Sequence, residues 1–334
     1  MAEIVLGIGT SHGPMLVTEV AEWKQRLAAD HADAHLWRGR EWTFDELVQA
    51  RASEGIAVHC EPTAQENARA SCLAAIDTLA NRLIEANVDV AVIVGNDQME
   101  LFDETGIPAL SLYCGAVIAN HEMPPERLAG LPPGIEAAVP GYIPGGGADY
   151  AGQPELGLVL AREMTARGFD PLVMRAMPKP ETPHAFGFVY RHLMRDKPVP
   201  SLPVLLNTFY PPNQPPAPRC AELGEAIFQA IGRWDSDARV AVIASGGLTH
   251  FAIDEDFDHA FLGSIERGDI RGFCAAQDEG VFQSGTSEMK NWFPVARAME
   301  MAHLRPEVID YVPCYRSMAG TGNAMAFVAW SASP

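Results

Sequence analysis

The fold of this chain is decided by residues 4–14, IVLGIGTSHGP. Its first six residues are an uninterrupted apolar run, which is typical of a strand buried on both faces. Gly13 and Pro14 end that strand at once and leave His12 at its carboxyl end. Ligands of open α/β sheets bind at this edge, so His12 is a candidate for chemistry rather than for core packing.

The same arrangement of a short apolar strand and a polar tip recurs along the chain. Strand-like runs cover residues 88–94, 169–174, 202–207 and 240–244. Helical patterns at 62–86, 154–168 and 219–231 separate them, and residues 256–301 are expected to be mostly helical. This alternation predicts one α/β domain over residues 1–334, with a largely buried mixed sheet flanked by helices.

Two segments do not follow the alternation. Residues 22–66 form a polar and aromatic insertion, in which Thr43 and Glu46 have the spacing of a capping box at the start of a short helix. Residues 120–150 are rich in proline and glycine, including PGGG at 144–147. The second segment is expected to be a long surface loop that could act as a lid.

Composition narrows the possible partners and compartment. The chain has 334 residues and a formal net charge of -19, from 43 acidic and 24 basic side chains. Such a surface repels nucleic acid and anionic membranes, so neither is expected as a partner. Six scattered cysteines without a C-x-x-C pair indicate reduced thiols, and no signal-peptide pattern or apolar run of about 18 residues is present. We therefore expect a cytoplasmic protein.

Four polar tips follow predicted strands, and a fifth polar candidate lies near a helix start. The tips contain His12, Gln98, His184 and His250. Glu288 lies in SGTSEMKNW, residues 284–292, where we expect the first turn of a helix to stabilise its anion. Two imidazoles and one carboxylate on separate loops can form a facial triad on Fe(II), with open positions for substrate and oxygen.

These motifs occur in an order that resembles the class III (LigB-type) extradiol ring-cleavage dioxygenases, among them the catalytic beta chain of protocatechuate 4,5-dioxygenase. The resemblance runs from residue 4 to about 328 and rests on TSHGP at 10–14, VGND at 94–97, NTFYPP at 207–212, RCAELGEAI at 219–227, GGLTH at 246–250 and SGTSE at 284–288. It implies non-haem Fe(II), a catecholic substrate, O2 and meta cleavage of the ring, a reaction of the EC 1.13.11 type.

The resemblance also implies roles for individual residues. His12 matches the first iron ligand, Glu288 the carboxylate ligand and His250 the acid/base histidine. His184 matches a second active-site histidine that contacts substrate or oxygen. One position departs from the pattern: the family's second ligand histidine follows the Asn-Asp pair directly, and this chain has Gln98 there.

The missing ligand has more than one possible source. His59, just before the long helix at 62–86, is the preferred candidate because imidazole is a better Fe(II) ligand than an amide oxygen. His121 is a further option. Alternatively, Gln98 is itself a ligand or orients one from outside the coordination sphere.

The two irregular segments favour a lignin-derived catecholic acid, such as 3-O-methylgallate or a hydroxylated biphenyl dicarboxylate, with Arg316, Tyr315 and Thr321 as candidates to bind its carboxylate. Family members are commonly oligomers, so a homo-oligomer is expected. Gln98 leaves two other functions open, which are a metal-dependent hydrolase or lyase on the same scaffold and a metal-free binding protein.

Overall fold

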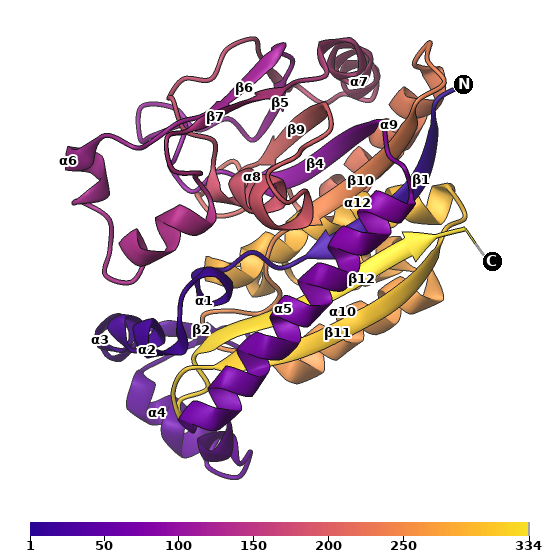
Figure 1. Ribbon diagram of the computed structural model, residues 1–334. Coiled ribbons are helices and arrows are strands. Elements are labelled where there is room, and N and C mark those ends of the chain that lie inside the picture. Colours follow the sequence, from indigo (N-terminus) through magenta and orange to yellow (C-terminus); the bar gives the residue numbers. More distant parts are fainter. Residues whose placement is uncertain (333–334) are drawn as a thin grey trace.

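The computed structural model describes residues 1–332 and is organised around one eight-stranded sheet (Figure 1). The four central strands run parallel, and antiparallel pairs on both sides make the sheet mixed. In spatial order the strands are β11 (Arg305–Tyr315), β12 (Gly322–Ser331), β1 (Glu3–Thr10), β10 (Arg239–Ser245), β4 (Val90–Asn96), β9 (Ser201–Leu206), β5 (Leu110–Tyr113) and β8 (Leu172–Met174). The predicted α/β fold with a mixed sheet flanked by helices is confirmed.

The central strands form where the sequence is apolar and rich in β-branched residues. Every residue of β4 and β9 is buried, as expected for parallel strands covered on both faces. Along β4, Val92 and Val94 pack into one hydrophobic core, whereas Ala91 and Ile93 pack into the other. The period of two along a strand therefore divides the interior into two cores, one on each face of the sheet.

Helices cover the two faces. One core contains residues of α7 (Pro154–Ala166), α9 (Ala217–Arg233), α10 (Glu255–Arg267), α11 (Ile270–Ala276) and α12 (Trp292–Met301). The other contains residues of α1 (Pro14–Val17), α5 (Pro62–Glu85), α8 (His184–Phe188) and the π-helix η4 (Val189–Leu193). Figure 1 shows α5 lying across this second face.

The insertion at 22–66 folds as a set of short elements beside the main sheet (Figure 1). Thr43 accepts a hydrogen bond from the backbone N–H of Glu46, and the Glu46 carboxylate accepts one from the backbone N–H of Thr43, so the predicted capping box is confirmed. The elements of this region are α2 (Val20–Trp23), η1 (Lys24–Arg26), α3 (Leu27–Ala32), β2 (His35–Trp37), β3 (Arg40–Trp42), α4 (Phe44–Ala50) and η2 (Ile56–Cys60).

The segment at 120–150 is more ordered than a long surface loop. It runs between β6 (Val117–Asn120) and β7 (Ala148–Ala151), which pair antiparallel, and it contains α6 (Pro125–Leu128) and η3 (Glu136–Gly141). The predicted long surface loop therefore contains short helices, because proline and glycine break regular elements without preventing short ones. Tyr142, directly after η3, is buried near the strand tips.

The last third of the chain contains two short helices and a strand that was not predicted. The short helices η5 (Glu279–Val281) and η6 (Ser284–Asn291) precede α12, in the region expected to be mostly helical. Strand β11 was not predicted, because its two prolines and its charged residues hide the strand pattern at the edge of the sheet. Within residues 1–332, no helix is both long enough and apolar enough to cross a membrane.

Candidate metal centre

The carboxyl ends of the parallel strands bring the polar tips to one edge of the sheet. His12 lies two residues after β1, Gln98 two residues after β4, and the 246–250 loop follows β10 directly. These three strands are neighbours in the order β1, β10, β4. The tips therefore converge at the edge where α/β sheets bind ligands.

Three side chains at this edge could hold a metal ion. Ligand atoms of His12, His184 and Glu288 lie within 4.8 Å of one another. The His12 and His184 rings meet edge to face with 4.6 Å between centroids, and Nε2 of His12 is 3.2 Å from Oε2 of Glu288. His12 and Glu288 are only 1% and 3% exposed. We call these three residues the metal cluster.

His12 presents an unprotonated nitrogen to this cluster. The Ser245 hydroxyl donates to the carbonyl of Ala185 at 2.6 Å, so its oxygen accepts from Nδ1 of His12 at 2.8 Å. The proton therefore sits on Nδ1, and burial lowers the pKa of His12 and favours this neutral form. Nε2 is buried and makes no hydrogen bond, although it faces the Glu288 carboxylate. A lone pair facing a carboxylate oxygen fits a site that takes a cation.

Glu288 is held as an anion by its neighbours. Its Oε2 accepts from the backbone N–H of Gly247 at 3.0 Å, and its Oε1 accepts from Nε2 of Gln98 at 2.6 Å. Burial alone would raise its pKa, but the positive charge that the surrounding histidines, His12 first, carry when protonated holds that pKa well below its usual value. A helix does begin here, at Ser284, but Glu288 is the fifth residue of η6 rather than part of its first turn. Its hydrogen-bond partners come from the loops after β4 and β10.

His184 joins the cluster through a partner that the sequence did not single out. It is the first residue of α8, and Glu100 accepts from both its Nδ1 at 2.7 Å and its backbone N–H at 3.0 Å. Burial would lower the pKa of His184, but the charge and hydrogen bonds of Glu100 raise it to about 9. With Nδ1 donating to Glu100, Nε2 is the nitrogen that a metal ion would bind, and the ion would displace the proton that this raised pKa keeps on the ring near neutral pH.

His250 lies beside the cluster in the loop after β10. Its Nδ1 donates to the carbonyl of Leu248 at 2.8 Å, and its Nε2 is 3.8 Å from Oε2 of Glu288. A Cβ on Gly285 would lie 2.2 Å from the ring, so only glycine fits there. The ring is thus fixed with an available nitrogen toward the cluster, as a proton acceptor requires.

The structure corrects the preferred source of the missing ligand. His59 is exposed on η2 and lies against the ring of Tyr315, with 5.7 Å between centroids. It is outside the metal cluster, because η2 packs against α5 and β11 rather than reaching the strand tips. His121 is also outside and pairs with Asp149 at 2.7 Å.

The residues expected to bind a substrate carboxylate have other partners. Arg316 makes a two-pronged ion pair with Asp30, both contacts at 2.7 Å, and Thr321 donates to the same carboxylate at 2.8 Å. The Tyr315 hydroxyl donates to Glu255. Arg316 and Thr321 thus join the insertion to the sheet, so they do not present free donors to a substrate.

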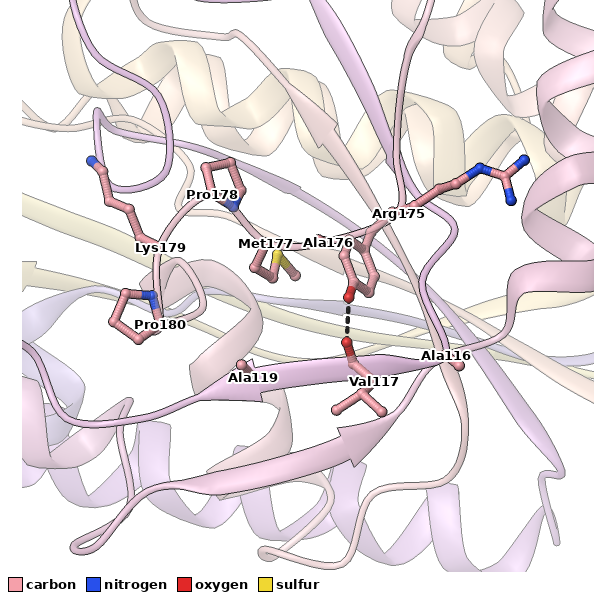
Figure 2. A pocket seen from close by; sticks show the side chains of 10 residues that line it. Ala116, Val117, Ala119, Arg175, Ala176, Met177, Pro178, Lys179 and Pro180 are labelled. Atoms are coloured by element: carbon pink, nitrogen blue, oxygen red, sulfur yellow. Dashed lines mark hydrogen bonds between the residues drawn. The ribbon is translucent and has the colours of Figure 1, made fainter.

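Two cavities lie outside the metal cluster. One, of about 570 Å³, is lined by the start of the β6 hairpin and residues 175–180 (Figure 2). The Tyr113 hydroxyl, which also lines it, donates to the Val117 carbonyl. The other, of about 170 Å³, lies between the β2–β3 hairpin and Thr249 and Thr286, which flank His250. Neither cavity is lined by a residue of the metal cluster, so the converging donor atoms, rather than a cavity, define the candidate site.

The comparison with known families agrees with this geometry. The family described as "Catalytic LigB subunit of aromatic ring-opening dioxygenase" matches residues 55–328. This chain belongs to the LigB family. The LigB family is that of the aromatic ring-opening dioxygenases, so the match supports a function of that type. A solved structure, described as that of uncharacterized protein JW3007 from Escherichia coli K12, covers 97% of this LigB chain and 99% of its own, at 10% identity and a TM-score of 0.45.

Proposed function

We propose that this LigB protein is an Fe(II)-dependent extradiol dioxygenase, which opens the ring of a catecholic aromatic acid next to its diol. The observation that carries the proposal is the convergence of His12, His184 and Glu288 donor atoms within 4.8 Å, in a chain of this family. Two imidazoles and a carboxylate are the ligand set typical of non-haem Fe(II) oxygenases.

The donor set fits Fe(II) at the level of individual atoms. His12 offers Nε2, His184 offers the nitrogen that Glu100 leaves free, and Glu288 offers Oε2. When bound, Fe(II) would act as a Lewis acid for the two catechol oxygens and as the site of O2 activation. The remaining chemistry belongs to side chains of this chain.

His250 is the side chain placed to move a proton. The carbonyl of Leu248 fixes its Nδ1–H, so Nε2 accepts a proton from a catechol hydroxyl and later returns it to an oxygen of the opened ring. Burial around the cluster excludes water and strengthens this interaction. Tyr142 also helps to shield the cluster from water, because its hydroxyl donates to the His12 carbonyl at 3.2 Å.

For the substrate we propose a lignin-derived acid such as 3-O-methylgallate or a hydroxylated biphenyl dicarboxylate. The insertion at 22–66 and Tyr142 from the 120–150 segment lie around the strand tips and would shape the pocket for such rings. Arg316 is paired with Asp30, so a donor other than Arg316 meets the substrate carboxylate. A cytoplasmic location and a homo-oligomeric state stay predictions.

The test is anaerobic reconstitution followed by oxygen. The protein is loaded with Fe(II), mixed with protocatechuate, gallate, 3-O-methylgallate or a biphenyl catechol, and exposed to air. We expect oxygen uptake equal to substrate consumed and a yellow ring-opened product. Zinc loading is the control and should give no uptake. Metal-dependent turnover without oxygen would instead support a hydrolase or lyase, and binding without turnover a binding protein.

A further inference from the structure

One loop contacts two of the three members of the metal cluster. Residues 98–100 follow β4, and the side chains of Gln98 and Glu100 reach Glu288 and His184 respectively. Between them, Met99 has a φ of 59°, a left-handed conformation that side chains other than glycine rarely adopt. Asp97 supports this shape by accepting the backbone N–H groups of residues 100–102 at 2.8–3.1 Å.

Glu100 determines which nitrogen of His184 is available. A carboxylate only accepts hydrogen bonds, so Nδ1 of His184, 2.7 Å away, carries the proton. The second oxygen of Glu100 accepts from the His184 backbone N–H and fixes the ring's approach. The result is a carboxylate–histidine pair that presents Nε2, the arrangement that orients imidazoles on protein-bound metals.

Gln98 faces the cluster with its nitrogen and not its oxygen. The Glu288 carboxylate cannot donate, so the amide group 2.6 Å from its Oε1 must be the NH2 group. An amide nitrogen with both hydrogens does not ligate a metal. By holding Oε1, Gln98 leaves Oε2 directed at Nε2 of His12, 3.2 Å away.

We propose that Gln98 and Glu100 are positioning residues of the metal centre, and that they make His184, rather than position 98, the third ligand. Gln98 aims Glu288, and Glu100 aims His184. This inference rests on the proposed metal-dependent function. A histidine at position 98 could itself bind the metal, because the side chain at this position already contacts Glu288.

The test measures metal affinity by titration of the metal-free protein with Co(II), read from the visible absorption of the bound ion. His184→Gln is expected to weaken Co(II) binding by more than about 100-fold, since it removes a ligand. Adding Gln98→His to His184→Gln should restore at least 10-fold of that loss, by supplying an imidazole from the neighbouring loop. His59→Gln is the matched control and should leave affinity unchanged. Unchanged affinity in His184→Gln overturns the proposal, and so does a double variant that binds no better than His184→Gln although its circular dichroism is native.

A double-mutant cycle separates positioning from mere folding. Glu100→Gln alone should weaken Co(II) binding about 10–100-fold. In the His184→Gln background, Glu100→Gln should cost nothing more, because Glu100 acts through the imidazole. Equal losses in both backgrounds would overturn the positioning role. Since every readout is metal binding, a protein that obeys the cycle but opens no ring contradicts only the proposed dioxygenase function.

Discussion

Two buried polar clusters lie at the same end of the sheet, and they differ in how their hydrogen-bonding groups are used. In the insertion, Asp30 meets two nitrogens of Arg316 and the hydroxyl of Thr321 with short, well-formed hydrogen bonds. In the metal cluster, Nε2 of His12 is buried without a hydrogen bond and faces the Glu288 carboxylate. A satisfied cluster is built to hold the fold together, whereas converging lone pairs are built to bind something.

The largest expected effect follows from removing the carboxylate of the metal cluster. Glu288→Gln should abolish ring opening and weaken metal binding by more than the roughly 100-fold typical for loss of an outer partner. Metal stoichiometry after reconstitution and oxygen uptake are the measurements. Glu41→Gln, on β3 and exposed, is the matched control. Full metal content in Glu288→Gln would mean that the cluster is not the metal site.

A substitution of His250 distinguishes a proton-transfer role from a metal-binding role for this side chain. His250→Gln should lower kcat by about 10²–10⁴-fold, the usual contribution of a general base. Metal content should not change, because the imidazole is held by the Leu248 carbonyl and lies outside the metal cluster. Bound iron and turnover are measured on the same preparation of the variant, which separates the two roles. An equal loss of both would make His250 a ligand.

Breaking the satisfied cluster should affect stability rather than chemistry. Asp30→Asn removes the partner of a buried guanidinium and should lower the free energy of unfolding by roughly 3–5 kcal/mol. Denaturant unfolding of the metal-free protein measures this, with metal stoichiometry as the control. A stable Asp30→Asn protein with a changed KM for an aromatic acid would instead show that Arg316 serves the substrate.

The same contrast explains how far the sequence could predict this molecule. The runs at 4–9, 88–94 and 240–244 specify buried strands, and their parallel arrangement places the tips together, so His12 and His250 could be found from local pattern. His184 follows β8, which runs antiparallel to these strands, and it reaches the site as the first residue of α8. The partner of His184 could not be found from local pattern, because Glu100 and His184 are 84 positions apart and meet only through the tertiary fold. His59 was preferred for its chemistry, but the packing of η2 on α5 and β11 keeps it elsewhere.

A third buried acid, Asp258, has its hydrogen bonds satisfied although it lies next to the site. It accepts from the backbone and hydroxyl of Thr249, next to His250, and from the hydroxyl of Tyr311. Burial, assisted by Asp254, outweighs these hydrogen bonds and raises the pKa of Asp258 to about 7. The folded protein therefore retains a proton that the unfolded chain releases near pH 4, an ordinary value for Asp.

From this shift we predict a pH-dependent loss of stability. Between about pH 4 and pH 7 the folded state binds more protons, so Asp258 contributes a fall of at most about 1.4 kcal/mol per pH unit as pH rises. Asp258→Asn should remove that contribution while keeping hydrogen-bonding groups at the position. Denaturant unfolding of the metal-free protein across this range, as the difference between wild type and variant, isolates it from other titrating groups. If the difference is flat with pH, Asp258 is ionised in the folded state throughout, and its three hydrogen bonds outweigh its burial.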